Sequence, residues 1–408
     1  MIYSTHSCPK REGLTLRHIH GIGPPQILLE SLNTYNMRIG LDARMYGPRH
    51  SGIGRYVEQL VAHLCLIPGD HEFVVFLKKE VFDTFVLPNE RWKKVLADIH
   101  WYGVDEQVHL THIIKREHVD LMHFPHWNVP LMYRDPFVVT IHDLIMFHYA
   151  RRDASTHGAL MYVIKDRLHR YIVRSTVKRA RHIFATSEFT KRDIVNTLHV
   201  SQEKISVTYQ ASFENVKLME QNAQTLLKNF YIEKPYVLYV GNAYPHKNIG
   251  TLIDAWKIFS REHPTYQLVL AGKESSWYET LKDRARGCGS IVFTGFVDDS
   301  QLAALYMYAH LYVFPSLYEG FGLPPLEAMT YGIPVISSGA SCLPEILGNA
   351  ALYFETTDIY DIVRALEEGT GNDEMRYLLR KNAKDETIRY SWNELAQRTF
   401  QTYITTMT

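Results

Sequence analysis

The sequence has no excess of either charge, because its 408 residues include 44 Lys and Arg and 44 Asp and Glu. Proteins that bind nucleic acid usually carry a basic excess, so the balance argues against nucleic acid as a partner. Long apolar runs are also missing: Val138–Phe147, one of the most apolar stretches, contains His142 and Asp143, and no run approaches the ~20 residues that span a bilayer. We therefore expect a cytoplasmic protein, either soluble or attached peripherally at the inner face of a membrane.

Cysteine is scarce as well. The four cysteines lie far apart and form no CxxC pair: Cys8, Cys65, Cys288 and Cys342. This usage predicts reduced thiols and excludes a zinc site or a disulfide framework. The 21 histidines are scattered, and no group of residues has the spacing of a metal site. His123 and His126, at an expected strand end, are interpreted as structural or acceptor-facing.

The composition is that of a globular protein, with 46% hydrophobic and 22% charged residues. The length fits two domains of moderate size. Residues 1–36 differ from the rest, because His, Pro and Gly are scattered there without sustained periodicity. We expect an N-terminal extension in this region, either mobile or packed as an ordered segment, and Met37 is a candidate start of translation.

From Met37 onward, short apolar runs alternate with helical patterns, which is typical of βαβ units and a mostly parallel sheet. After a first strand in Met37–Arg44, strands are expected at Phe73–Leu77, Leu121–Phe124, Phe137–Ile141 and His182–Thr186. Helices are expected near Ile53–Cys65 and Ser187–Leu198.

The alternation restarts after a polar stretch, Ser212–Lys234. The strands expected in this second half are Tyr236–Gly241, Gln267–Ala271, Ile291–Phe293, Leu311–Phe314 and Pro334–Ser337. The helices are expected near Ile249–Arg261, Asp299–Ala309 and Pro324–Tyr331.

This pattern predicts an α/β protein with two Rossmann-like domains whose parallel sheets face each other across a cleft. Ligands of such sheets bind at the carboxyl ends of the strands. The expected boundaries are 1–36 for the extension, 37–215 for the first domain, 216–235 for the linker, 236–390 for the second domain and 391–408 for a C-terminal helix that returns to the first domain.

The segment Glu319–Glu327 (EGFGLPPLE) follows one of these strands and opens a helix. Gly320 and Gly322 let the backbone approach a ligand. The N–H groups of Gly322 and Leu323, at the positive end of the helix, form an anion site. Glu319, in the loop, and Glu327, in the first helical turn, are acceptor-only groups suited to pairs of sugar hydroxyls. Taken alone, the segment is equally well explained as a Gly-rich turn with a charge that stabilises the helix.

A second segment, Gly241–Asn248 (GNAYPHKN), lies at another strand-to-helix junction. Lys247 is close to a helix N-terminus, where a cation is disfavoured unless an anion is present. A bound phosphate would explain its position, although a solvated lysine is the commoner case. Two such loops in one half of the chain favour a diphosphate site.

These segments resemble glycosyltransferase family 4, whose members have the GT-B fold, and the spacing of Glu319 and Glu327 matches its E-x7-E signature. The further segments that carry the resemblance are Ser51–Tyr56, His123–His126, Val139–Leu144, Ala185–Phe189, Ser341–Gly348 and Ser391–Trp392. The resemblance covers about residues 37–400. Within the family, the sequence resembles bacterial mannosyltransferases of O-antigen, capsule and lipopolysaccharide synthesis. It implies a retaining hexosyltransferase with acceptor-side residues in 37–215 and a nucleotide-sugar-binding domain in 236–390.

The resemblance also implies roles for single residues. His142, Lys247 and Glu319 would be catalytic: Lys247 would stabilise the departing diphosphate, Glu319 would hold the donor sugar, and Glu327 would bind the ribose. The whole implied donor site is Gly52, Gly54, Gly241, Asn242, His246, Lys247, Glu319, Gly320, Phe321, Gly322, Leu323 and Glu327. Gly52 and Gly54 would lie in a loop near the phosphates. No metal and no cofactor besides the sugar nucleotide is implied.

Asn242 departs from the family pattern, because many members carry an arginine soon after this glycine. His246 or another basic side chain is then expected to complete the phosphate contacts. His142 has three readings: a contact of the donor sugar, which the resemblance favours, a buried histidine paired with Asp143 or the backbone, or a general base.

Alternatives to a glycosyltransferase stay open. A glycosidase would use Glu319 and Glu327 as its acid and nucleophile, but such carboxylates face each other across the scissile bond. A sugar-nucleotide epimerase or a non-catalytic nucleotide-sugar-binding protein would share the fold.

The partners follow from the resemblance and from one basic helix. The donor is expected to be GDP-mannose, with a UDP-hexose as the alternative, and the acceptor a saccharide or a lipid-linked saccharide. The basic stretch Lys165–Arg181 is interpreted either as a solvated surface helix or as a peripheral contact with anionic lipid.

Overall fold

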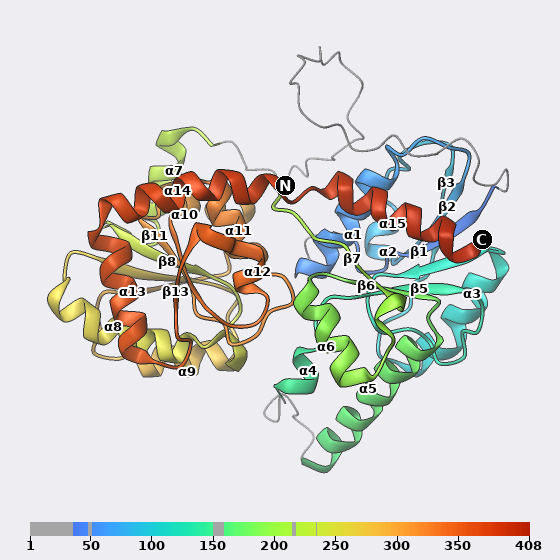
Figure 1. Cartoon of the computed structure of the whole chain (residues 1–408), viewed down its shortest axis with the longest axis horizontal. Helices are drawn as coiled ribbons and strands as arrows, with labels where there is room; N and C mark the ends of the chain where they lie inside the picture. Colours follow the sequence, from blue (N-terminus) through green and yellow to red (C-terminus); the bar gives the residue numbers. More distant parts are fainter. Residues whose placement is uncertain (1–35, 48–50, 150–158, 214–217, 234) are drawn as a thin grey trace. The chain divides into compact units, whose positions relative to one another are not determined.

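The computed structural model of the chain describes residues 36–47, 51–149, 159–213, 218–233 and 235–408. All but the last residue of the expected N-terminal extension, 1–36, lie outside this part. Two parallel β-sheets with helices around them make up the described chain (Figure 1). By internal contacts it divides into two compact units. One comprises the described residues up to Thr140, together with Tyr171–Ile183 and Ala396–Thr408. The other comprises the described residues of Ile141–Arg170 and Phe184–Leu395.

The first sheet, sheet A, has seven strands in the order β3-β2-β1-β4-β5-β6-β7. Strand β1 lies parallel between β2 and β4, with Ile39 level with Phe73 and with Leu121. All three side chains are buried. The strands are β1 (Arg38–Asp42), β2 (Glu72–Leu77), β3 (Trp92–Leu96), β4 (Leu121–Phe124), β5 (Phe137–Ile141), β6 (His182–Ala185) and β7 (Ile205–Val207).

The helices that accompany these strands are mostly short. They are α1 (Ser51–Leu64), α2 (Lys79–Phe82), a π-helix at Glu106–Leu110, α3 (Thr111–Arg116), α4 (Ile145–His148), α5 (Ala159–Arg179), α6 (Glu188–Leu198), a 3-10 turn at Gln202–Lys204 and α15 (Trp392–Met407). Helix α1 has a strongly one-sided apolar face, which buries Tyr56, Val57, Leu60 and Val61.

The second sheet, sheet B, has the order β10-β9-β8-β11-β12-β13, and each strand runs parallel to its neighbours. Its strands are β8 (Tyr236–Val240), β9 (Gln267–Ala271), β10 (Ile291–Gly295), β11 (Leu311–Phe314), β12 (Val335–Ser338) and β13 (Ala351–Phe354). Its helices are α7 (Glu220–Lys228), α8 (Ile249–Glu262), α9 (Ser276–Ala285), α10 (Asp299–Tyr308), α11 (Leu323–Thr330), α12 (Leu343–Leu347), α13 (Ile359–Gly371) and α14 (Asp373–Ile388), with 3-10 turns at Pro245–Lys247 and Gly348–Ala350.

The strand order of each sheet reverses direction at one point, between β1 and β4 in sheet A and between β8 and β11 in sheet B. The loops that follow two such strands diverge, and the space between them is where open parallel sheets bind ligands. The loops after β8 and β11 are the two segments that the sequence singled out, Gly241–Asn248 and Glu319–Glu327.

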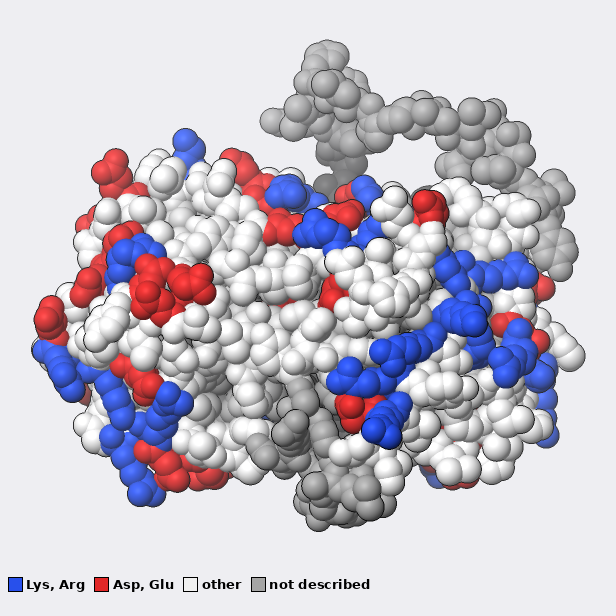
Figure 2. Space-filling model, turned by 60° about the horizontal axis from the view of Figure 1, so that its bottom comes forward, with Lys and Arg blue, Asp and Glu red and all other residues white. Residues whose placement is uncertain are grey.

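Helix α5 places cationic and apolar side chains together on its exposed side. Arg167, Arg174 and Lys178 are exposed, and so are Leu168 and Tyr171, by 51% and 61%. Figure 2, turned so that the lower side of Figure 1 comes forward, shows a band of Lys and Arg side chains in the region of this helix. Of the further cations in Lys165–Arg181, Lys165 is exposed, whereas Arg170, Arg179 and Arg181 bind Asp166 and main-chain carbonyls.

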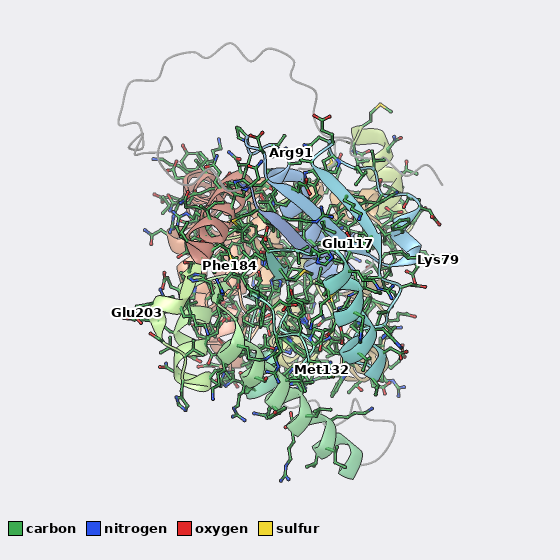
Figure 3. The ribbon with its side chains drawn as sticks, turned by 90° about the vertical axis from the view of Figure 1, so that its right-hand side faces the viewer. Lys79, Arg91, Glu117, Met132, Phe184 and Glu203 are labelled. Carbon is green, nitrogen blue, oxygen red and sulfur yellow. The ribbon has the colours of Figure 1, made fainter. Side chains whose placement is uncertain are left out.

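The two edges of sheet A differ in chemistry. Glu117 accepts hydrogen bonds from Arg38 and Lys93 at the amino ends of β1 and β3. Figure 3 labels Arg91, just before β3, and Glu117, between α3 and β4. Salt bridges therefore close the amino edge, and the carboxyl edge carries the loops that could bind a ligand.

The C-terminal helix α15 supplies a buried partner for a histidine of the first unit. The Tyr403 hydroxyl lies 2.5 Å from His123 Nδ1, and Thr140 Oγ1 lies 2.8 Å from His123 Nε2. His123 is completely buried. Both of its ring nitrogens are thus used inside the protein, which makes His123 a structural residue.

Two expectations about the elements need correction. The polar stretch expected to be a linker, 216–235, contains helix α7, which packs against α10. Ala223 and Leu227 are four residues apart and both buried, so one narrow apolar stripe forms this helix despite its polar average. Strand β3 was not expected, because Lys93 and Lys94 interrupt its apolar pattern; only its first residue, Trp92, is buried.

Candidate functional site

The loop between β11 and α11 holds Glu319 in a nearly enclosed position. Its side chain is 10% exposed, and its backbone N–H donates to Ser341 Oγ at 3.0 Å. Lys247 Nζ lies 2.5 Å from Glu319 Oε1 and over the Phe314 ring, 5.6 Å from its centroid. Two of the three expected catalytic groups are therefore in direct contact.

The backbone of the β8 loop fixes Lys247 at this place. Lys247 ends the 3-10 turn Pro245–Lys247, and Asn248 follows in a left-handed conformation with φ of 58° before α8 begins. The Asn248 side chain donates to the Thr356 carbonyl at 2.7 Å. The Leu317 N–H donates to the His246 carbonyl at 2.8 Å, which ties the two loops together.

This pairing revises the explanation for a cation beside a helix N-terminus. The sequence suggested a bound phosphate as the compensating anion, and in the structure the Glu319 carboxylate takes that place. An anionic ligand at this end of α8 would therefore compete with Glu319 for Lys247.

Gly320 lies where a side chain has no room. A Cβ atom built on it would be 1.9 Å from the His142 carbonyl oxygen, and both residues belong to the second unit. Three hydroxyls surround the Gly320 carbonyl oxygen: Thr186 Oγ1 at 3.0 Å, Ser187 Oγ at 2.7 Å and Thr190 Oγ1 at 3.2 Å. The loop is thus held by a close backbone approach and a hydroxyl cluster.

His142 follows β5 at the same place. Its carbonyl accepts a hydrogen bond from Thr186 Oγ1 at 2.7 Å. The Gln210 side-chain N–H donates to His142 Nδ1 at 3.2 Å, so the neutral ring carries its hydrogen on Nε2. The neighbouring Asp143 carboxylate accepts from the Ile145 N–H.

Helix α11 carries the second glutamate of the motif. Gly322 caps the helix with φ of 93°, and the helix begins at Leu323 with proline in its first positions. Glu327 is therefore the fifth helical residue, in the second turn, and the expectation of a first-turn position was wrong. Its Oε2 accepts from the Tyr306 hydroxyl at 3.1 Å. Burial, together with the Glu327 carboxylate, raises the pKa of Tyr306 well above its ordinary value, so the hydroxyl stays a donor.

Other residues of the expected donor site have different surroundings. Asn242, which follows Gly241, is exposed, and its Oδ1 accepts from the Tyr244 N–H at 3.4 Å. His246 is only 2% exposed and lies against the Tyr244 ring, which favours packing over phosphate contact. Phe321 is buried and meets the Tyr390 ring edge-on.

Gly52 and Gly54 belong to the first of the two units. The prediction that they lie in a loop was wrong. Helix α1 begins at Ser51, so both glycines lie in its first turn. The Gly54 carbonyl accepts from the Gly47 N–H at 3.1 Å.

Sequence reasoning missed the polar groups that support the Gly320 loop. Besides the hydroxyl cluster, Glu345 accepts hydrogen bonds from the N–H groups of Glu188 and Phe189 at the start of α6, at 2.7 and 2.9 Å. A carboxylate is favourable at a helix N-terminus. For the hydroxyl cluster, the sequence does contain a signal, the Ser187-x-x-Thr190 pattern. In the structure Ser187 caps α6 by accepting a hydrogen bond from the Thr190 N–H.

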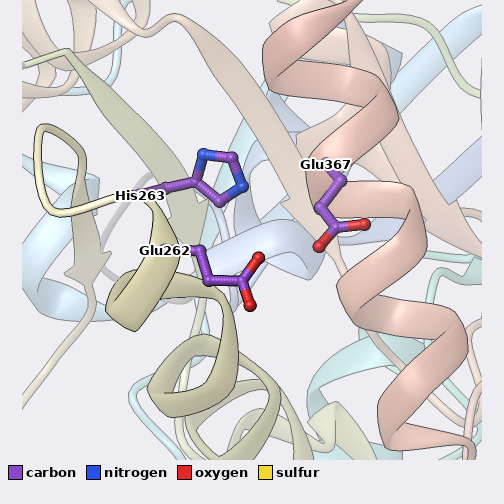
Figure 4. A group of neighbouring side chains, drawn as sticks. All are labelled: Glu262, His263 and Glu367. Carbon is purple, nitrogen blue, oxygen red and sulfur yellow. The ribbon is translucent and has the colours of Figure 1, made fainter.

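One group of possible metal ligands is found in the described part of the chain: Glu262, His263 and Glu367 (Figure 4). It lies where α8 ends and on the later part of α13, at the amino edge of sheet B and away from Glu319. The His263 ring stacks on Phe259 with centroids 4.4 Å apart, which accounts for its position without an ion.

No helix in the described ranges combines the length and the apolar character needed to cross a bilayer.

The two parallel sheets and the loops after β8 and β11 are those expected of a glycosyltransferase, and comparison with known proteins identifies the same class. Residues 50–211 match Glycosyltransferase Family 4, and residues 227–386 match Glycosyl transferases group 1. The chain belongs to this family of glycosyltransferases, and its two parallel-sheet domains are those of the GT-B fold.

The similar proteins include mannosyltransferases. The O-antigen chain mannosyltransferase B of Escherichia coli is 29% identical over 276 residues, which are 65% of this chain and 69% of that protein. A serotype-specific mannosyltransferase WbdA of E. coli is 31% identical over 228 residues, 54% of this chain but only 28% of that protein. A crystal structure of Anabaena HepE in complex with UDP-glucose has a TM-score of 0.68 and 16% identity, covering 90% of this chain and 99% of that one.

Proposed function

We propose that this protein transfers a mannosyl group from GDP-mannose to a saccharide or lipid-linked saccharide acceptor, with retention at the anomeric carbon. The observation that carries the proposal is the contact between Lys247 and Glu319 at the point where sheet B reverses its strand order. The similarity to O-antigen mannosyltransferases supports mannose as the sugar.

In this proposal the donor diphosphate takes the place of Glu319 as the anion beside Lys247. Lys247 and the N–H groups at the start of α11 stabilise the charge that develops on the diphosphate as the C1–O bond breaks. Glu319, released from the lysine, accepts hydrogen bonds from hydroxyls of the sugar. Glu327, oriented by Tyr306, accepts from the ribose.

The acceptor hydroxyl attacks C1 from the face that the diphosphate leaves, and a diphosphate oxygen takes its proton. His142 contributes its Nε2–H beside the sugar, which leaves it a donor and not a base. The acceptor side is assigned to residues 37–215 and the nucleotide-sugar side to residues 236–390.

A UDP-hexose is the second candidate donor, because the similar HepE was crystallised with UDP-glucose. A thermal-shift panel of nucleotide sugars separates the two. Stabilisation of the wild-type chain by GDP-mannose, and not by UDP-glucose or UDP-galactose, is the expected result. Stabilisation by UDP-sugars alone would replace GDP-mannose in the proposal, and no stabilisation by any nucleotide sugar would overturn it.

We also propose that α5 attaches the protein to a membrane surface where lipid-linked acceptors are found. Ile164, Leu168 and Tyr171 form an exposed apolar stripe at helical spacing. Arg167 and Arg174 are exposed beside it. A helix that offers apolar and cationic groups together binds anionic lipid through both.

A further inference from the structure

A buried cluster of charges lies at the carboxyl edge of sheet A. Arg44, two residues after β1, donates from Nε to Asp42 Oδ1 at 2.8 Å and from Nη2 to Asp42 Oδ2 at 2.7 Å. Its Nη2 also donates to Glu106 Oε1 at 2.7 Å. Arg44 and Glu106 are 3% and 0% exposed. Burying three charges in this way is costly.

Asn128 extends this cluster and is left with an unused acceptor. Its Nδ2 donates to Glu106 Oε2 at 2.5 Å. A carboxylate only accepts hydrogen bonds, which fixes the orientation of the amide. Asn128 is 4% exposed, and its Oδ1 is buried with no hydrogen-bond partner among the described residues. A buried polar oxygen normally accepts a hydrogen bond. A ligand or a water molecule could supply the donor for Asn128 Oδ1.

A small cavity adjoins this group, lined by Asp42, Arg44, Met45, Pro125, His126 and Asn128. Its volume is about 10 Å³, which is roughly the space that one water-sized group needs. The lining residues lie at the end of β1 or just after β1 and β4, the two strands between which sheet A reverses its order. The cavity is therefore at the place where a parallel sheet binds ligands.

Aromatic rings stand beside the cavity. The Tyr102 ring centroid is 5.4 Å from that of Trp127 and 6.2 Å from that of His126, a lining residue. Tyr102 is 57% exposed and has φ of 65°, a conformation that a large side chain rarely adopts. Its N–H donates to Glu106 Oε2 at 2.8 Å, which holds it there. The same carboxylate thus positions both Tyr102 and Asn128.

We propose that this cavity and its aromatic rim form a subsite for one sugar unit of the acceptor. A sugar hydroxyl enters the cavity and donates to Asn128 Oδ1, while the C–H face of the ring lies against Tyr102 and Trp127. The proposal rests on the function proposed above, to which it adds the acceptor residues.

The charges at the cavity favour a neutral polyhydroxyl ligand over an ion. The Arg44 guanidinium lines it and opposes a metal ion, while Asp42, Glu106 and the Asn128 oxygen oppose an anion. Burial alone would lower the pKa of Arg44, but the Asp42 and Glu106 carboxylates more than offset this and raise it above its ordinary value. Arg44 therefore stays charged.

Saturation-transfer NMR on the full chain tests the subsite with methyl α-mannoside, methyl α-glucoside and N-acetylglucosamine as probes. At least one probe should give a signal with the wild type. Asn128→Ala and Tyr102→Gly should each lower that signal at least five-fold, whereas Tyr102→Phe, which keeps the ring, should retain it. Glycine suits the left-handed conformation at position 102, so Tyr102→Gly keeps the test valid if Asn128→Ala fails to fold.

Lys282→Met, which removes a lysine paired with Glu274 and Glu279 on the other unit, is the control and should retain the glycoside signal. No signal from any probe with the wild type, or undiminished signals in Tyr102→Gly, would overturn the subsite. The thermal shift with GDP-mannose on the same proteins keeps the two proposals apart. If glycosides bind in a way that depends on Asn128 but no nucleotide sugar binds, only the proposed function is overturned. If GDP-mannose binds but no glycoside does, only the subsite is overturned.

Discussion

Lys247 Nζ lies 2.5 Å from Glu319 Oε1, and both side chains are nearly enclosed, with 14% and 10% of their surface exposed. Glu319 comes from the loop after β11 and Lys247 from the loop after β8, so the fold brings together residues 72 positions apart. In the proposed reaction each group has a second partner, the donor sugar for Glu319 and the diphosphate for Lys247. The ion pair then holds both side chains in place until the donor arrives.

Removing either partner should abolish transfer and also cost stability. We expect Lys247→Met to lower kcat/KM for the donor by about 100-fold or more, since a group aimed at developing charge contributes this much. Glu319→Gln should also lower kcat/KM, because the sugar hydroxyls lose a charged acceptor. Each should lower the free energy of unfolding by about 1–3 kcal/mol, because the remaining group loses its partner. Steady-state kinetics and urea unfolding measure the two effects.

The double variant separates the two roles of the pair. Lys247→Met with Glu319→Gln leaves no unpaired charge at this position, so the double variant should regain part of the stability and none of the activity. Lys282→Met, on α9, removes a lysine that pairs with Glu274 and Glu279 and should leave transfer unchanged. Wild-type kcat/KM in Lys247→Met would contradict the proposed role.

Gly320→Ala should disrupt the loop. The added methyl would meet the His142 carbonyl oxygen at 1.9 Å, and neither backbone segment can move without breaking the hydrogen bonds to Thr186 and Ser187. We expect a loss of about 3 kcal/mol or more in the free energy of unfolding and a loss of donor binding by thermal shift.

Gly339→Ala is the matched control in the same unit. A Cβ atom there meets nothing closer than the Phe354 carbonyl oxygen at 3.7 Å, which is ordinary contact. Equal stability of the two variants would show that the close approach at Gly320 relaxes easily and that the loop is not held as described.

Much of the fold could be predicted from the sequence because the strands are continuous apolar runs buried on both faces. Leu121–Phe124, Phe137–Ile141, Gln267–Ala271 and Leu311–Phe314 have the same bounds as predicted. Such runs, separated by helical patterns, carry their signal within a few residues. Elements whose apolar positions are few and mixed with lysine or glutamine, β3 and α7, have no such local signal.

The candidate site could be predicted only in part. The Glu319 and Lys247 loops were found because Gly, Pro and charge at strand-to-helix junctions have a local meaning. The direct ion pair between Lys247 and Glu319 was not predicted, since nothing in the sequence states which side chains 72 positions apart will meet. The hydroxyls around the Gly320 carbonyl and the enclosed position of His246 are also products of the tertiary structure.

His169 should make the protein less stable in mild acid. Burial lowers the pKa of this α5 histidine to about 4, whereas the unfolded chain binds the proton near pH 6.5. The stability that the neutral ring supports is therefore full above about pH 6.5 and is lost as the pH falls toward 4. His169→Phe removes this dependence.

Urea unfolding at pH 7 and pH 5 checks the expectation. Between these values the wild type should lose up to about 1 kcal/mol more stability than His169→Phe, after allowance for the partial exposure of the ring. His112→Phe, at an exposed position on α3, serves as control and should follow the wild type. Parallel losses in the wild type and His169→Phe would show that His169 does not carry the effect.

Helix α5 gives the last prediction, on membrane attachment. We expect wild-type protein to sediment with vesicles that contain anionic lipid and to be released by salt, because screening weakens such contacts. The triple variant Arg167→Glu, Arg174→Glu, Lys178→Glu should lose most of this binding, as each cation near an anionic surface contributes about 1 kcal/mol. The matched triple variant Arg380→Glu, Lys381→Glu, Lys384→Glu reverses three exposed cations on α14 and should bind as the wild type does. Equal loss in both variants would mean that general charge, and not the α5 face, governs binding. Retained binding in the α5 variant would assign that helix to the solvated surface.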